Sequence, residues 1–269
     1  MKKFKKLNIG SVKINLKKQT ITPLSDKADE AFIKALKGEL LGKDVRYTYE
    51  KGVTTLYADG VWIMRADKKE GMTHLNLPTT KVLENGFLST DSELKCLFAS
   101  ELQYIGKYVL SLNDCIEHQH LPKVRFIDNG FLMNNHQLKT FLAPLVRYIG
   151  HYSLREAAVQ RFVSPLLEYA GRDVLLRATK TDLVSTPTLF AAQRGFLAVN
   201  QRLTRFYAPN FYPERYGAVL SREDEAFLLH PDKEKLMNER GNLKRILKKE
   251  TFFERSLLKA KNYFINTRF

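Results

Sequence analysis

Apolar and polar residues alternate along much of the first seventy positions. Alternation over residues 12–16 predicts a strand, and the apolar spacing of residues 26–38 predicts a helix. Three further alternating runs fill residues 45–66, separated by the pairs Lys51-Gly52 and Asp59-Gly60. Asp-Gly is a strong hairpin signal because a type I′ turn needs positive φ at both central residues. We therefore expect a three-stranded antiparallel meander at residues 45–66.

From residue 90 onward, capping signals predict helices: Ser, Thr or Asp begins several segments, and Gly ends them. The predicted helices cover residues 90–106, 136–150, 153–171, 222–230, 231–240 and 242–264, and the predicted strands cover residues 107–112, 123–127, 131–133 and 173–179. No internal repeat, low-complexity segment or flexible linker is evident.

These elements predict an α+β fold class. An antiparallel β-meander-rich part, residues 1–134, precedes a helix-rich C-terminal part, residues 135–269, which ends in a long basic amphipathic helix. The two parts are either separate domains or halves of one shared core.

Charge is concentrated at the two ends of the chain. The formal net charge is +15; residues 1–20 carry +7 and residues 241–269 carry +6, so these segments supply +13 of it. Such an excess favours polyanionic partners, nucleic acid first and anionic membrane second. The alternative is that lysine-rich ends only keep the protein soluble.

The predicted terminal helix separates apolar from cationic residues. At about 100° per residue, an apolar stripe over residues 246–264 lies opposite a row of cations. Successive turns would present these cations about 5.4 Å apart, a spacing that can follow a phosphate backbone. A solvated helix face and a membrane-surface helix are the alternatives. The predicted phosphate contacts are Lys244, Lys248, Arg255 and Lys259.

Residues 202–217, RLTRFYAPNFYPERYG, combine three arginines with five aromatic residues and two prolines. We expect an ordered aromatic-rich connection there. Arginine binds phosphate, and exposed aromatic side chains stack on unpaired bases. Alternatively, the aromatic residues anchor the segment to the core. The candidate base or sugar contacts are Arg205, Tyr207, Tyr212 and Arg215.

Cys115, His118 and His120 form the one candidate metal cluster, but their spacing is too cramped for a structural zinc site. The His-x-His pattern also resembles that of rolling-circle nickases, with Tyr148 or Tyr152 as the implied nucleophile. A glutamine stands between the histidines, where that family has a hydrophobic residue. Surface histidines in a loop are the favoured interpretation, and a metal-dependent nuclease or nickase is an alternative.

Residues 53–66, VTTLYADGVWIMRA, and more faintly residues 174–184, VLLRATKTDLV, each follow a predicted helix. Their pattern resembles the strand–turn–strand unit of DNA polymerase sliding clamps. The resemblance rests on these two short segments and implies a ring that encircles DNA. The helix-rich second half and the basic C-terminal helix depart from that architecture.

The sequence contains no phosphate-binding glycine loop, dinucleotide fingerprint or nucleophile elbow. Its two cysteines, the missing secretory signal and the lack of a long apolar run predict a soluble cytoplasmic protein. We expect no cofactor. The main hypothesis is a non-enzymatic nucleic-acid-binding protein that makes largely sequence-independent contacts to phosphates of RNA or DNA, with single strands slightly favoured. The alternative is a structural or assembly protein that docks an acidic partner or an anionic membrane through its basic C-terminal helix.

Overall fold

The N-terminal strands and helix follow the predicted apolar pattern. The computed structural model describes residues 6–9, 12–16, 18, 20–24, 29–67, 71–90, 93–189, 191–193 and 195–211. These residues belong to one compact unit, residues 1–228, whereas the second unit, residues 229–269, lies outside the described residues. The first antiparallel sheet contains β1 (Lys6–Ile9), β2 (Val12–Asn15) and β3 (Thr20–Pro23). The predicted strand at residues 12–16 is therefore confirmed.

Helix α1 (Glu30–Leu40) confirms the helix predicted at residues 26–38, with later bounds. It begins after Asp29, whose side chain accepts a hydrogen bond from the Phe32 N–H at 2.8 Å. The helix continues two residues past Gly38 and buries Leu40 in the core. Gly38 therefore lies inside the helix, although its position near the end resembles a stop signal.

The predicted meander is confirmed. Strands β4 (Val45–Glu50), β5 (Val53–Ala58) and β6 (Val61–Asp67) pair antiparallel, and β7 (Gly71–Asn76) adds a fourth strand. Asp59 and Gly60 have φ values of 49° and 80°, as the hairpin signal requires. Beyond β7, the short strand β9 (Cys96–Phe98) pairs in parallel, which begins a different architecture.

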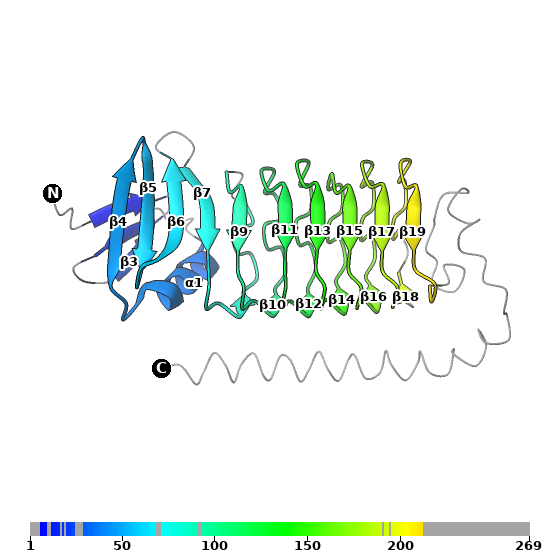
Figure 1. The fold of residues 1–269 in the computed structure, drawn as a ribbon, viewed down its shortest axis with the longest axis horizontal. Helices are drawn as coiled ribbons and strands as arrows, with labels where there is room; N and C mark the ends of the chain where they lie inside the picture. Colours follow the sequence, from blue (N-terminus) through cyan, green and yellow to red (C-terminus); the bar gives the residue numbers. More distant parts are fainter. Residues whose placement is uncertain are drawn as a thin grey trace. The chain divides into compact units, whose positions relative to one another are not determined.

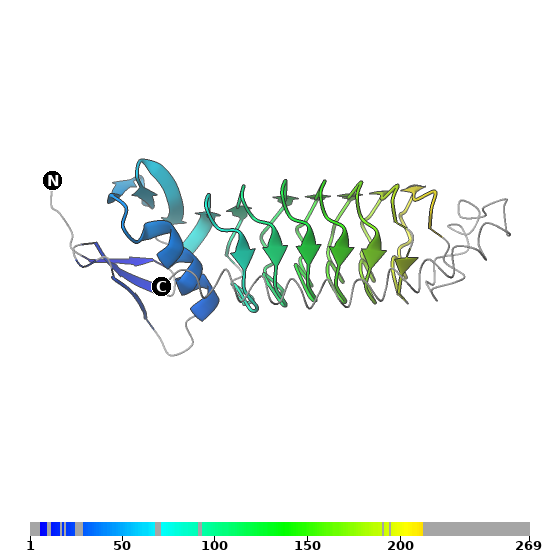
Figure 2. The same cartoon turned by 90° about the horizontal axis from the view of Figure 1, so that it is seen from below.

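From residue 82 the chain winds into a β-solenoid (Figures 1 and 2). From β10 onward each coil contributes one strand to each of two parallel sheets, whereas β9 of the first coil pairs with β7. The first sheet contains β8 (Val82–Leu83), β10 (Tyr104–Ile105), β12 (Phe126–Ile127), β14 (Tyr148–Ile149), β16 (Tyr169–Ala170) and β18 (Ala191–Ala192). The second contains β11 (His118–His120), β13 (Thr140–Leu142), β15 (Arg161–Val163), β17 (Leu183–Ser185) and β19 (Arg205–Tyr207). In the second sheet, the first residue of each strand pairs with the first residue of the next strand; these residues are His118, Thr140, Arg161, Leu183 and Arg205. The coils between them are therefore 22, 21, 22 and 22 residues long.

The solenoid contradicts the predicted helix-rich C-terminal part. In the described residues, segments 90–106, 136–150 and 153–171 contain strands and turns and no helix. The physical reason is the spacing of the inward side chains, which point into the coil at steps of three, two, three and three residues. An amphipathic helix also places apolar residues three positions apart, which explains the wrong prediction. The glycines that were interpreted as helix ends lie at corners of the coils. One such inward set is Leu138, Phe141, Ala143, Val146 and Ile149.

The predicted short strands also differ from the structure. Residues 107–112, 131–133 and 173–179 form turns, and only Phe126–Ile127 of the segment 123–127 is a strand. The predicted boundary between residues 134 and 135 lies between β12 and β14 in the sequence, and these two strands pair directly with each other. The fold of the described chain is therefore mostly β with one helix, and the helices predicted at 222–230, 231–240 and 242–264 lie outside the described residues.

Glycines occupy a coil corner where neighbouring coils approach closely. A Cβ atom at Gly150 would lie 2.5 Å from Asn129 Oδ1 and 2.7 Å from the Asn129 backbone nitrogen. A Cβ atom at Gly106 would lie 2.8 Å from the Asn85 backbone nitrogen. A larger residue at Gly106 or Gly150 would therefore require backbone movement, whereas the equivalent corner after β12 holds Asp128.

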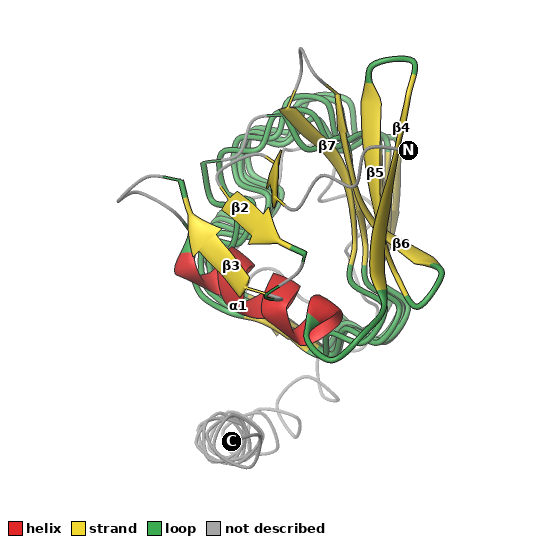
Figure 3. Cartoon of the chain, turned by 90° about the vertical axis from the view of Figure 1, so that its left-hand side faces the viewer, coloured by secondary structure: helices red, strands yellow, loops and turns green. Residues whose placement is uncertain are grey.

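Helix α1 is fastened to the first coil by side chains near both of its ends. Glu39 is fully buried and accepts hydrogen bonds from the Thr79 N–H at 3.0 Å, the Thr79 hydroxyl at 2.8 Å and the Thr80 hydroxyl at 2.8 Å. At the other end, the Asp29 carboxylate accepts a hydrogen bond from the Leu88 N–H. Viewed along the solenoid, α1 and the sheet of β4–β7 lie on different sides at its N-terminal end (Figure 3).

Candidate nucleic-acid interface

Four of the five strands of the second solenoid sheet bury their middle residue, and the middle residue of β19, Phe206, is half-buried against the core; the first and third residues of each strand point outward. The same pattern occurs in β9, which lies beside β11 (Figure 1). We call the outward side chains of these six strands the outer sheet face. No acidic residue occurs among them. The outer sheet face consists of Cys96, Phe98, His118, His120, Thr140, Leu142, Arg161, Val163, Leu183, Ser185, Arg205 and Tyr207.

Exposed aromatic side chains lie near both ends of this face. Phe98 on β9 is 50% exposed and Tyr207 on β19 is 59% exposed. Beside Phe98, the Trp62 ring makes an edge contact at 5.6 Å between centroids, and the Arg65 guanidinium lies 4.9 Å from the centre of the Trp62 ring. Trp62 and Arg65 thus extend the outer sheet face onto the meander with an arginine–aromatic pair.

The two arginines of the outer sheet face differ from those solenoid cations that are held in ion pairs with carboxylates. Arg161 and Arg205 are exposed, and within the described residues neither forms an ion pair. Their strands are separated by β17, so the two side chains start about 9.6 Å apart, two strand spacings. In contrast, Lys123 and Lys139 pair with glutamates at 2.6 and 2.5 Å.

One of the acidic residues next to the face is neutralised by a neighbour. Glu117 precedes β11, and a hydrogen bond from the Lys139 ammonium together with its charge lowers the pKa of the Glu117 carboxyl. Burial raises the pKa of Cys96, and the charge of Glu117 adds to that effect. The Cys96 thiol is therefore protonated at neutral pH and is a poor nucleophile.

The structure places two of the eight predicted nucleic-acid contacts on one surface. Arg205 and Tyr207 both point outward from β19. Of the predicted aromatic-rich connection, residues 202–211 are described, and their other aromatic residues pack toward the core: Phe211 is buried, and its ring lies 6.1 Å from that of Phe206. The remaining predicted contacts lie outside the described residues; they are Tyr212, Arg215, Lys244, Lys248, Arg255 and Lys259.

The candidate metal cluster does not come together as a set of ligands. His118 and His120 lie on β11, not in a loop, and His118 Nδ1 is 2.8 Å from the Thr140 hydroxyl. Cys115 lies in the turn before that strand, where its N–H donates to Asn113. Within the described chain, no group of three or more His, Cys, Asp or Glu side chains could hold a metal ion.

A ladder of aromatic residues runs along the first sheet, at Tyr104, Phe126, Tyr148 and Tyr169. The rings of Tyr148 and Tyr169 lie 5.1 Å apart with an angle of 2° between their planes. Because these two rings cover each other's faces, their inner faces are closed to bases. The same packing places Tyr148 in a stacked pair and not beside the histidines proposed for a nickase.

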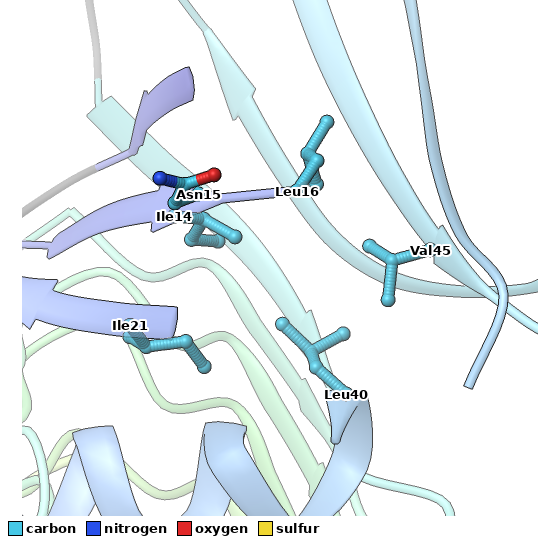
Figure 4. Close-up of a pocket in the computed structure, with 6 residues that line it drawn as sticks. All are labelled: Ile14, Asn15, Leu16, Ile21, Leu40 and Val45. Carbon is cyan, nitrogen blue, oxygen red and sulfur yellow. The ribbon is translucent and has the colours of Figure 1, made fainter. Parts of the chain in front are cut away.

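The pocket shown in Figure 4 offers no catalytic chemistry. It lies where α1 approaches the N-terminal strands, and none of its lining side chains titrates. Five of the six are aliphatic; the lining residues are Ile14, Asn15, Leu16, Ile21, Leu40 and Val45.

Two predictions about the wider fold can also be compared with the structure. Residues 53–66 form the antiparallel hairpin expected of a sliding-clamp unit, but residues 174–184 contain turns followed by β17, and no helix precedes them. In the described part of the chain, no helix has both the length and the apolarity needed to cross a bilayer. Comparisons with protein families, curated proteins and solved structures gave no match to this chain.

Sequence reasoning missed Trp62, Arg65, Phe98 and Arg161 as candidate contacts. The placement of Phe98 and Arg161 follows from the coil length, because residues 22 positions apart occupy neighbouring strands. Trp62 and Arg65 lie on β6 of the meander, where that period does not apply. A search for residues at that period would have placed Arg161 on the same face as Arg205.

Proposed function

We propose that this protein binds single-stranded nucleic acid, RNA or DNA, through its outer sheet face and without catalysing a reaction. The observation that carries the proposal is the pairing of Arg161 and Arg205, exposed and without ion pairs among the described residues, with the exposed rings of Phe98 and Tyr207. No acid interrupts this face. It therefore combines phosphate-binding cations with stacking platforms on a single surface.

The chemistry of the face favours single strands over a duplex. Exposed aromatic rings stack on bases only where the bases are unpaired. From β9 to β19 there are five strand spacings, about 24 Å in all. A stacked strand with about 3.4 Å per nucleotide would cover that distance with roughly seven nucleotides.

The cations of the C-terminal sequence form a second proposed contact. Lys244, Lys248, Arg255 and Lys259 supply four positive charges, which the helical pattern of the sequence assigns to one stripe. Their proposed role is sequence-independent contact to phosphates. Each phosphate contact on a single strand adds about 0.7 to the slope of log affinity against log salt concentration.

Fluorescence anisotropy with labelled single-stranded RNA, single-stranded DNA and duplex DNA, at about 50 and 200 mM salt, tests the proposal. We expect tighter binding of single strands and a steep loss with salt. The double variant Arg161→Glu/Arg205→Glu should bind at least tenfold more weakly, and its salt slope should fall by about 1.4 because two phosphate contacts are lost.

The matched control changes the net charge of the protein by the same amount, but at residues beside the first sheet. Lys81→Glu/Arg125→Glu replaces two exposed cations at equivalent positions of the coils that contain β8 and β12. This control should keep most of the affinity. If single strands fail to bind at low salt, or if both double variants lose affinity equally, the outer sheet face is not the binding site. A separate variant that reverses Lys244, Lys248, Arg255 and Lys259 to Glu measures the C-terminal contribution.

A further inference from the structure

Two neighbouring coils carry exposed leucines at equivalent positions. Each leucine lies in the segment that leads from a strand of the second sheet to the next strand of the first sheet. The two segments are residues 145–148, LVRY, and residues 166–169, LLEY. They are equivalent because their last residues, Tyr148 and Tyr169, pair with each other. Leu145 is 38% exposed and Leu166 is 42% exposed. Exposed leucines at consecutive coils form one apolar patch.

The apolar patch is bounded by polar residues on both sides along the coil stack. One coil earlier the equivalent position holds Lys123, which pairs with Glu101 at 2.6 Å. One coil later it holds Thr188, whose hydroxyl donates to the Pro165 and Leu167 carbonyls at 2.9 and 3.0 Å. The two leucines therefore form the apolar centre of a small surface with a polar rim. Protein interfaces have the same organisation.

Two opposite charges lie next to these leucines. Arg147 donates to Glu168 Oε1 through Nε at 2.8 Å and through Nη2 at 2.5 Å. The second carboxylate oxygen, Oε2 of Glu168, accepts no hydrogen bond from any described residue. We call Leu145, Arg147, Leu166 and Glu168 the corner patch; it shares no residue with the outer sheet face.

We propose that the corner patch is a two-fold interface between two copies of this chain. A two-fold axis that runs parallel to the strands and passes between the two coils reverses the coil order in the second copy. Leu145 then faces the partner's Leu166, and Arg147 faces the partner's Glu168. Both contacts occur twice, so apolar surface meets apolar surface and each cation meets an anion.

The charge pattern selects this occupant over an unrelated protein. A patch with an arginine on one coil and a glutamate at the equivalent position of the next coil is complementary to itself after a half turn. The free oxygen of Glu168 accepts the partner's Arg147, which links the four charged groups into one network. Two leucines per copy bury little area, so the dimer is expected to be weak, with a dissociation constant on the order of micromolar or higher.

Sedimentation velocity of the full chain over a wide concentration range tests the proposal. The wild type should pass from monomer to dimer as its concentration rises. Leu145→Glu and Leu166→Glu should each weaken association at least tenfold, because they bury an unpaired charge among leucines. The control Leu112→Glu changes a leucine that is 49% exposed in a turn elsewhere in the solenoid, and it should leave association unchanged.

A charge exchange tests the two-fold geometry itself. Arg147→Glu gives a chain with two acids at the corner patch, and Glu168→Arg gives a chain with two cations. Neither variant should dimerise alone, because like charges would face each other across the axis. An equimolar mixture of the two variants should dimerise, because both facing pairs then have opposite charge.

Circular dichroism checks that each variant is folded, and exposed ion pairs contribute little to folding stability, so both charge variants should fold. A wild type that stays monomeric at all concentrations overturns the proposal. A mixture that stays monomeric while the wild type dimerises excludes this arrangement, as would an equal effect of Leu112→Glu.

Discussion

The buried carboxylate of Glu39 fastens α1 to the first solenoid coil, so its removal should weaken the whole N-terminal end. The side chain is fully buried and accepts three hydrogen bonds from Thr79 and Thr80, at 3.0, 2.8 and 2.8 Å. The Lys43 ammonium lies 3.5 Å from Oε2 and balances the charge. Glu39→Ala removes every one of these contacts at once.

The size of the effect follows from the partners that remain. Hydrogen bonds to a charged group contribute about 1.5–3 kcal/mol each, but the two hydroxyls can turn toward other acceptors. The Thr79 N–H cannot turn, and a buried donor left without an acceptor costs about 1–3 kcal/mol by itself. We therefore expect Glu39→Ala to lower the free energy of unfolding by about 3–5 kcal/mol, and Glu39→Gln, which keeps one acceptor, to cost less.

Urea unfolding followed by circular dichroism measures this loss. The control is Glu30→Ala, which removes an exposed carboxylate from the first turn of the same helix and should cost less than about 1 kcal/mol. If Glu39→Ala lowers the free energy of unfolding no more than Glu30→Ala does, the Glu39 carboxylate does not hold α1 against the solenoid.

Three other substitutions test the corners, the helix and the pH response. Gly150→Ala should lower the unfolding midpoint, because its Cβ atom would lie 2.7 Å from the Asn129 backbone nitrogen; an unchanged midpoint would mean that the corner relaxes. Gly38→Ala, with nothing within 4 Å of the added atom, should stabilise α1 by about 1 kcal/mol in the same urea assay. Burial and the nearby charge of Arg65 lower the pKa of His74. The unfolded chain therefore takes up the His74 proton first as pH falls, and stability is lost below the ordinary histidine pKa of about 6.5. His74→Gln should flatten the fall in urea midpoint between about pH 7 and pH 5, and an equally steep fall would refute this cause.

The sequence was sufficient for the local structure of the meander. Alternation and the turn Asp59-Gly60 specify strands and a hairpin within a few residues, because each signal acts on neighbouring positions. Helix α1 could be predicted for the same reason, although its bounds depend on tertiary burial of Leu40.

The solenoid was missed because its information lies at a longer period. Inward residues at steps of three and two resemble an incomplete helix within any one coil. Only the comparison of coils separates the two folds, and prolines at equivalent positions were a readable signal at steps of 22, 21, 22 and 22: Pro122, Pro144, Pro165, Pro187 and Pro209.

The candidate interface was predictable only in part. Arg205 and Tyr207 were found because they are close in sequence. Arg161 and Phe98 join them only after the chain has wound through several coils, so their common face could not be inferred without the coil length. The predicted cations at Lys244 and beyond stay a prediction, since they lie outside the described residues.

Ultraviolet crosslinking to single-stranded RNA and single-stranded DNA, followed by mass spectrometry of the crosslinked peptides, tests the central claim most directly. The account predicts crosslinks at Phe98 and Tyr207, with Trp62 as a further site, and their loss in the Arg161→Glu/Arg205→Glu variant. Crosslinks confined to residues 242–264, or crosslinks at Phe98 and Tyr207 that persist unchanged in that variant, would contradict the assignment of the outer sheet face as the nucleic-acid interface.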